Sequence, residues 1–156
     1  MRLAIGLLSV LIWSTAQAQP VRKVTTCFEQ NIAALRLSQL DEAISYCDQI
    51  AGDNAAPSDR RGQALAQRGL IHARRWATIS SEPEALQGIQ DITEGLQLHA
   101  PPTERKHHLL LVRGHLYAVV GQFKRAAEDY RAILDSNPAN RAAWEALKKL
   151  TVSHGS

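Results

Sequence analysis

The feature that most constrains the fold is an internal repeat built around small residues. Residues 119–126, VVGQFKRA, line up with residues 36–43, RLSQLDEA, at a small residue, a glutamine, an apolar residue and an alanine. Around the later copy, apolar residues at helical spacing predict helices over about 103–120 and 124–135, joined by a turn at Gly121. A helical hairpin is therefore the expected unit, and the chain repeats it.

Extending the alignment gives three copies with one insertion. The copies are anchored by the pairs Asn31 and Ala43, Gly69 and Gly88, and Gly114 and Ala126. The first and third pairs are twelve residues apart and the middle pair is nineteen apart, so the middle copy is seven residues longer. The extra residues fall in 73–85, ARRWATISSEPEA, where Ser81 and Glu84 match the capping-box pattern of a helix start.

Composition agrees with an all-helical single domain. Aromatic residues make up only 5% of the chain, and no long alternation of Val, Ile or Thr is typical of a strand. We expect an all-α domain over residues 19–156. Its hairpins are expected at roughly 22–51, 58–100 and 103–136, followed by a capping helix at 139–151.

Residues 1–18 have the features of a secretory signal peptide. Arg2 supplies a positive charge, residues 3–13 form an apolar run of eleven, and Ala16 and Ala18 provide small residues before a cleavage site. A membrane-spanning helix needs about 20 apolar residues, so we favour cleavage after Ala18; a retained anchor is the alternative. The mature chain is then expected in the periplasm or outside the cell, without membrane insertion.

The later copy carries a recognisable order of small, aromatic and proline positions. These positions are Gly114-x2-Tyr117, Ala126-x3-Tyr130, Pro138 and Trp144-x2-Leu147. The pattern resembles the tetratricopeptide repeat family. Degenerate versions follow at Gly69, His72, Gly88, Ile92 and Pro101, and at Asn31, Ala34, Ala43 and Cys47. The resemblance covers about residues 22–150 and implies a right-handed superhelix of about three hairpins plus a C-terminal capping helix.

The resemblance also gives the small residues a role in packing. Gly114 is expected to meet Ala126 where the two helices of a hairpin cross, and Gly69 is expected to meet Gly88. Close packing there would offset the cost of a helical glycine, about 1 kcal/mol relative to alanine. The other repeat-packing positions are Tyr117, Tyr130, Pro138 and Trp144.

The two cysteines stand at equal offsets from the crossing point of the first hairpin. Cys27 lies four residues before Asn31, and Cys47 lies four residues after Ala43. In antiparallel helices that cross at this level, the cysteines would face each other. We predict a disulfide, as expected in an exported chain, with two buried free thiols as the alternative.

The family's concave surface, carried over position by position, gives a candidate partner-binding groove. Its residues are Phe28, Ile32, Gln67, Leu70, Arg74, His108, Leu111 and His115. Family members that clamp the free carboxylate of a chaperone tail use Lys and Asn at positions held here by Phe28, Ile32, Ala66, Leu70, Leu111 and His115. Recognition of an acidic C-terminal tail is therefore not expected.

The histidines allow a second interpretation of the protein's function. His107, His108 and His115 share one expected helix, and the last two lie two turns apart on one face. Two turns rise about 10.5 Å, which is too far for both rings to reach one ion unaided. We expect solvated or groove-lining histidines and no cofactor, with a small metal or haem carrier as the alternative function.

No motif in the sequence indicates catalysis. Phosphate-binding loops, dinucleotide-binding glycine patterns, zinc-protease motifs and nucleophile elbows do not occur. A net charge of +3 gives little reason to expect nucleic-acid binding. Trp76, in the insertion, is expected either to cover the end of the repeat core or to anchor a partner. We therefore predict a non-enzymatic adaptor or assembly factor of the bacterial periplasm that binds a protein segment; its oligomeric state is not predicted.

Overall fold

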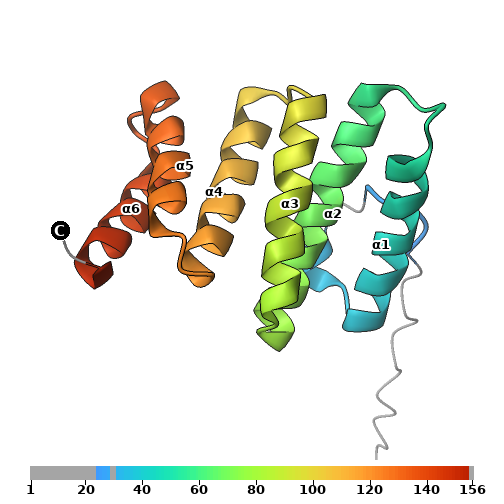
Figure 1. The fold of residues 1–156 in the computed structure, drawn as a ribbon, viewed down its shortest axis with the longest axis horizontal. Coiled ribbons are helices and arrows are strands. Elements are labelled where there is room, and N and C mark those ends of the chain that lie inside the picture. The colour runs from blue at the N-terminus through green and yellow to red at the C-terminus, as the bar shows by residue number, and fades with distance from the viewer. Residues whose placement is uncertain (1–23, 29–30, 155–156) are drawn as a thin grey trace, which may run out of the picture.

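The computed structural model describes residues 24–28 and 31–154, and over these residues the chain is all-helical (Figure 1). Its elements are a 3₁₀ turn η1 (Ile32–Ala34) and the helices α1 (Leu37–Gly52), α2 (Ser58–Ile79), α3 (Glu82–Leu98), α4 (Thr103–Val119), α5 (Phe123–Ser136) and α6 (Arg141–His154). The all-α prediction is confirmed. The expected signal peptide and its cleavage site lie outside the described residues.

The helices follow one another across the molecule in chain order (Figure 1). Neighbours in sequence are neighbours in space: α2 packs most extensively on α3, α4 on α5, and α1 on α2. This packing is consistent with a helical repeat superhelix.

The start of the chain differs from the expected first hairpin. Val24 to Phe28 form no regular structure, and only η1 follows before α1. The run Val24, Thr25 and Thr26 consists of β-branched residues, which are poor helix formers. Val24 is 1% exposed, so the segment is held by burial and not by helix formation.

The inserted residues form the end of α2, the junction and the start of α3. Ser80 ends α2 in the left-handed region, with φ of 52°, and Ser81 is the N-cap residue of α3. Ser81 makes no side-chain capping bond, in contrast to the expected capping box. The Glu84 carboxylate instead accepts a hydrogen bond from Nδ1 of His72 at 2.7 Å, joining α3 back to α2.

Helices α2 and α3 approach closely at Gly69 and Gly88, as predicted. A Cβ added at Gly69 would lie 3.0 Å from the carbonyl oxygen of Gly88, and one added at Gly88 would lie 3.2 Å from that of Gly69. Gly114 behaves differently from the expectation that it meets Ala126. The atoms nearest to it belong to the ring of Tyr130, which is 1% exposed.

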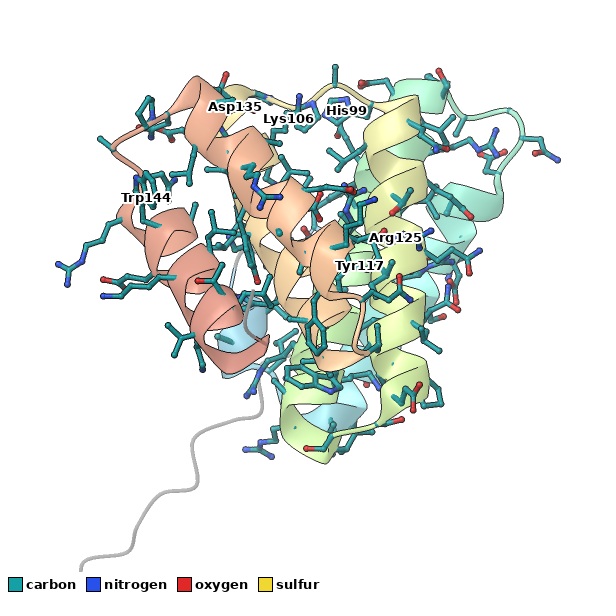
Figure 2. All side chains as sticks on the ribbon, turned by 60° about the vertical axis from the view of Figure 1, so that its left-hand side comes forward. His99, Lys106, Tyr117, Arg125, Asp135 and Trp144 are labelled. Atoms are coloured by element: carbon teal, nitrogen blue, oxygen red, sulfur yellow. A yellow bond between two sulfur atoms is a disulfide. The ribbon has the colours of Figure 1, made fainter. Side chains whose placement is uncertain are left out.

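Two aromatic residues, Tyr117 and Trp144, make contacts in the C-terminal part of the repeat. The guanidinium groups of Arg113 and Arg125 each lie 5.7 Å from the ring centre of Tyr117 (Figure 2). Trp144 is 55% exposed, and its indole nitrogen donates a hydrogen bond of 2.8 Å to the carbonyl of Pro138. Trp144 thus fixes the turn between α5 and α6 from the outside of the molecule.

Candidate functional site

Two neighbouring cavities lie along α4, and Ala73 and Val112 line both of them. We call the one formed by the N-terminal segment, α2 and α4 the first cavity; its volume is about 530 Å³. It is lined by Phe28, Asn31, Ile32, Ala33, Gln67, Leu70, Ala73, Arg74, Arg105, His108 and Val112. The second cavity, also about 530 Å³, is formed by α2, α4, α5 and α6.

The first cavity brings together six of the eight predicted groove residues. These are Phe28, Ile32, Gln67, Leu70, Arg74 and His108. His115 lines the second cavity instead, and Leu111 lines neither, because it packs against the core. The predicted groove is therefore divided between two adjacent sites.

The residues of the first cavity differ in how a partner could reach them. Leu70 is 7% exposed and Gln67 is 3% exposed, so both form the floor. Phe28 is 36% exposed and lies at the rim. Leu70 is one of the predicted groove residues, but it also belongs to the core, so its substitution would damage the core as well as the cavity.

Positive groups line the first cavity, and no carboxylate of the described residues does. The Arg105 guanidinium donates to Oε1 of Gln67 at 2.6 Å, and Arg74 donates to the carbonyl of Ala33 at 3.2 Å. The buried Nε of Arg74 has no hydrogen-bond partner among the described residues. Partial burial lowers the pKa of His108 below 6.5, and the positive charge of Arg105 lowers it further.

A disulfide fixes the wall of the first cavity. Cys27 and Cys47 are bonded, as predicted, with Cα atoms 4.6 Å apart and both side chains fully buried. The geometric reason differs from the expected one, because only Cys47 is on a helix. The bond attaches the non-helical segment to α1 and so holds the adjacent Phe28 at the rim.

Sequence reasoning missed two buried ion pairs that repeat between hairpins. Arg68 holds Asp91 through two hydrogen bonds of 2.7 and 2.6 Å, and Arg113 holds Asp129 through two of 2.9 and 2.6 Å. The signal was present in the alignment: each Arg precedes the helical glycine, and each Asp comes three residues after the facing small residue.

The second hairpin adds further ion pairs along α2. Arg68 also bonds Asp48 of α1, and Arg75 contacts both Asp41 of α1 and Glu84 of α3. Basic residues of α2 therefore lie between acidic residues of both neighbouring helices, which ties α1, α2 and α3 together.

The histidines do not converge. His107 bonds the hydroxyl of Ser136 at 2.7 Å, while His108 and His115 lie in different cavities. Within residues 24–28 and 31–154, no group of three or more His, Cys, Asp or Glu side chains could hold a metal ion. None of the described helices is both long enough and apolar enough to span a bilayer.

Comparison with known proteins gives one distant similarity. The chain is 31% identical over 84 residues to DnaJ homolog subfamily C member 3 of Gallus gallus, a match that covers 54% of this chain and 16% of that protein. The matched stretch is thus far short of the relative's length. No family model and no solved structure matches the chain. The helical arrangement is consistent with tetratricopeptide-like repeats.

Proposed function

We propose that the protein is a non-enzymatic scaffold or assembly adaptor of the bacterial periplasm that binds a segment of a partner protein in the first cavity. The observation that carries the proposal is the composition of this cavity. Its floor combines the apolar Leu70 with Gln67, its rim carries Phe28, and its charged lining groups, Arg74 and Arg105, are both positive. The distant similarity to a DnaJ homologue and the repeat-like packing support a role in protein interaction.

The lining indicates which kind of segment would fit. An apolar side chain of the partner would cover Phe28 and the floor around Leu70, while an acidic side chain beside it would reach the guanidinium groups. The partnerless Nε of Arg74 offers a donor for such a carboxylate. An amphipathic segment with interspersed acidic residues satisfies both requirements.

Reversing charge at the rim tests the proposal, with circular dichroism to check that the helices are kept, because changing Arg105 also removes its bond to the buried Gln67. In Arg105→Glu/His108→Glu, both changed side chains are exposed. Partner capture from a periplasmic extract, quantified by mass spectrometry, should fall at least tenfold, because a favourable charge pair becomes a repulsive one. The matched control is Lys124→Glu/Arg131→Glu, on the exposed surface of α5. Equal capture by both variants would exclude the first cavity as the binding site.

Removing the disulfide tests whether the cavity wall must be fixed. Replacing both cysteines by serine opens a loop closed over 20 residues and should lower the free energy of unfolding by about 3 kcal/mol. Urea unfolding measures this loss. At a temperature where the variant is still folded, partner capture should also weaken, because Phe28 is released from the rim. Unchanged capture would show that the N-terminal wall takes no part in binding.

A further inference from the structure

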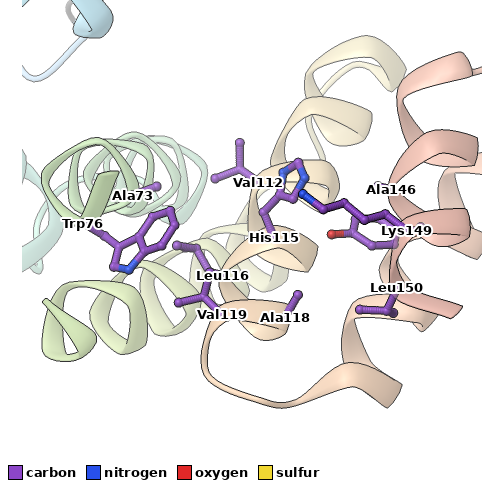
Figure 3. A pocket seen from close by; sticks show the side chains of 11 residues that line it. Ala73, Trp76, Val112, His115, Leu116, Ala118, Val119, Ala146, Lys149 and Leu150 are labelled. Atoms are coloured by element: carbon purple, nitrogen blue, oxygen red, sulfur yellow. The ribbon is translucent and has the colours of Figure 1, made fainter. Parts of the chain in front are cut away.

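The second cavity combines an apolar floor with a cluster of polar groups at one end. Trp76 and Ala73 come from α2, Leu116 and Val119 from α4, and Lys149 from α6 (Figure 3). The remaining lining residues are Val112, His115, Ala118, Tyr130, Ala146 and Leu150. The cavity volume of about 530 Å³ lies within the range of about 300–1,000 Å³ typical of small-molecule sites.

The polar groups gather on the α6 side, away from Trp76. Figure 3 shows Lys149 extending toward His115, with Trp76 at the opposite side of the cavity. The His115 ring stacks edge-on against that of Tyr130, with ring centres 5.9 Å apart. One end of the cavity therefore presents an ammonium group, an imidazole and a phenol, and the other presents an indole and aliphatic side chains.

The charge of this polar end is positive at neutral pH. Partial burial lowers the pKa of His115 below 6.5, and Lys149 lowers it further, so the imidazole is neutral. Burial, followed by the charge of Asp129, raises the pKa of Tyr130 to about 12, so its hydroxyl keeps its proton. Lys149 forms no ion pair with a carboxylate of the described residues, and no Asp or Glu lines the cavity.

We propose that the second cavity binds a medium-chain carboxylic acid, with its carboxylate at Lys149 and its hydrocarbon chain against Trp76. Each end of the cavity matches one part of such a ligand. The ammonium group supplies the counter-charge and a hydrogen bond to the carboxylate. The apolar side chains of α2 and α4 remove the hydrocarbon chain from water. The second cavity adjoins the first through Ala73 and Val112, but Lys149 and Trp76 line only the second, so this inference does not depend on the function proposed for the first.

Calorimetric titration with decanoate, below the concentration at which it forms micelles, tests the proposal on the disulfide-bonded protein. Decanoate should bind saturably, and decanol and decyltrimethylammonium should bind at least tenfold more weakly. Lys149→Met should weaken decanoate binding about tenfold, because a charge-assisted hydrogen bond is lost. Lys148→Met is the matched control and should bind as the unchanged protein does, since Lys148 does not line the cavity.

Fluorescence tests the orientation of the ligand. In a chain carrying Trp13→Phe and Trp144→Phe, Trp76 is the remaining tryptophan of the three. Decanoate brominated at its last carbon should quench this tryptophan, and decanoate brominated beside the carboxylate should quench it much less. Equal quenching by both would contradict the proposed orientation and overturn the proposal.

Filling the cavity provides a second variant that leaves Lys149 in place. Ala146→Phe should abolish decanoate binding, while circular dichroism reports whether the helices are retained. The proposal is overturned if decanoate shows no saturable binding, if decanol binds as tightly, or if folded Lys149→Met and Ala146→Phe variants both bind normally.

Discussion

In both the α2–α3 and the α4–α5 hairpin the two helices pack closely, but different residues make the close contact. In α2–α3, glycines seven residues apart occur on both helices, at Gly62 and Gly69 and at Gly88 and Gly95. A Cβ added at Gly95 would lie 2.7 Å from the backbone nitrogen of Ala66, so the two backbones are in contact. In α4–α5, one helix carries a glycine and the other fills the space with an aromatic ring.

What the hairpins share is the buried ion pair beside the crossing. Arg68–Asp91 and Arg113–Asp129 occupy corresponding positions, although the helices around them approach to different distances. The ion pair is therefore common to both hairpins, whereas the residues at the crossing differ between them.

Removing the acidic partner of each ion pair should have the largest effect. Asp91→Ala should lower the free energy of unfolding by about 4 kcal/mol and Asp129→Ala by about 3 kcal/mol, because each removes the two-bond carboxylate partner of a partly buried arginine. Arg68 then keeps only its ion pair with the exposed Asp48. Asp91 is fully buried and also accepts a hydrogen bond of 3.0 Å from Gln87, so its loss costs more. Urea unfolding measures both.

Asp135→Ala, on the exposed surface of α5, is the control and should change stability little. If Asp91→Ala lowered the free energy of unfolding by less than Asp129→Ala, the expectation that the ion pair of α2–α3 contributes more to stability would be wrong.

The next effect should come from adding one methyl group between α2 and α3. Gly95→Ala should lower the free energy of unfolding by about 3 kcal/mol, because the new Cβ meets backbone atoms of α2 and the helices must separate. Thermal unfolding followed by circular dichroism measures the loss. Gly52→Ala, with no atom within 4 Å of the added Cβ, should be neutral or stabilising. A tolerated Gly95→Ala would mean that the backbones are not in contact.

In the α4–α5 hairpin, a glycine-to-alanine substitution should lower the free energy of unfolding by less. A second substitution, at the ring that the new methyl group meets, should remove most of that loss. Gly114→Ala places a Cβ 2.5 Å from the ring of Tyr130, a side chain that can shift, so we expect a loss of about 1.5 kcal/mol. In a double-mutant cycle, Tyr130→Leu should remove most of this cost. Additive effects of the two substitutions would show that the ring is not the obstacle.

The smallest expected effect is a pH dependence specific to α4. His108 and His115 correspond to Gln63 and Leu70 of α2. Their pKa values are lowered in the folded protein, so the unfolded chain binds more protons below about pH 6.5, and stability falls as the pH is lowered through that range. His108→Gln/His115→Leu should lose less stability between pH 7 and pH 5, measured by urea unfolding. An equal loss would exclude these histidines as the source.

The sequence was sufficient for features that depend on helical periodicity and on the repeat. The α2–α5 region and the turn at Gly121 follow from helical spacing. The pairing of Cys27 with Cys47 was also predicted correctly, although on the premise that both cysteines lie on helices. Gly121 has φ of 76°, a conformation that side chains rarely adopt, which explains why a glycine marks this turn.

The features that were missed depend on tertiary contacts. The alignment places Cys27 and Asn31 on the first helix of the 22–51 hairpin, but Val24 to Phe28 form no helix; Val24 is buried there and Cys27 is bonded to α1. The facing partner of Gly114 depends on which way the Tyr130 ring turns. The predicted groove is one surface, whereas His115 lines the second cavity and the N-terminal segment lines the first, with Ala73 and Val112 shared by both.

The Cys27–Cys47 bond also decides how the molecule carries mechanical load. Tension applied through a handle N-terminal to Cys27 passes across the disulfide into α1, and residues 28–46 bear none of it. With the bond intact, the two Cα atoms stay 4.6 Å apart. With the bond reduced, the chain between Cys27 and Cys47, which are 20 positions apart, can extend to about 70 Å. In the oxidised protein the disulfide transmits the force directly to α1. In the reduced protein the segment between the two cysteines must extend before the force reaches α1.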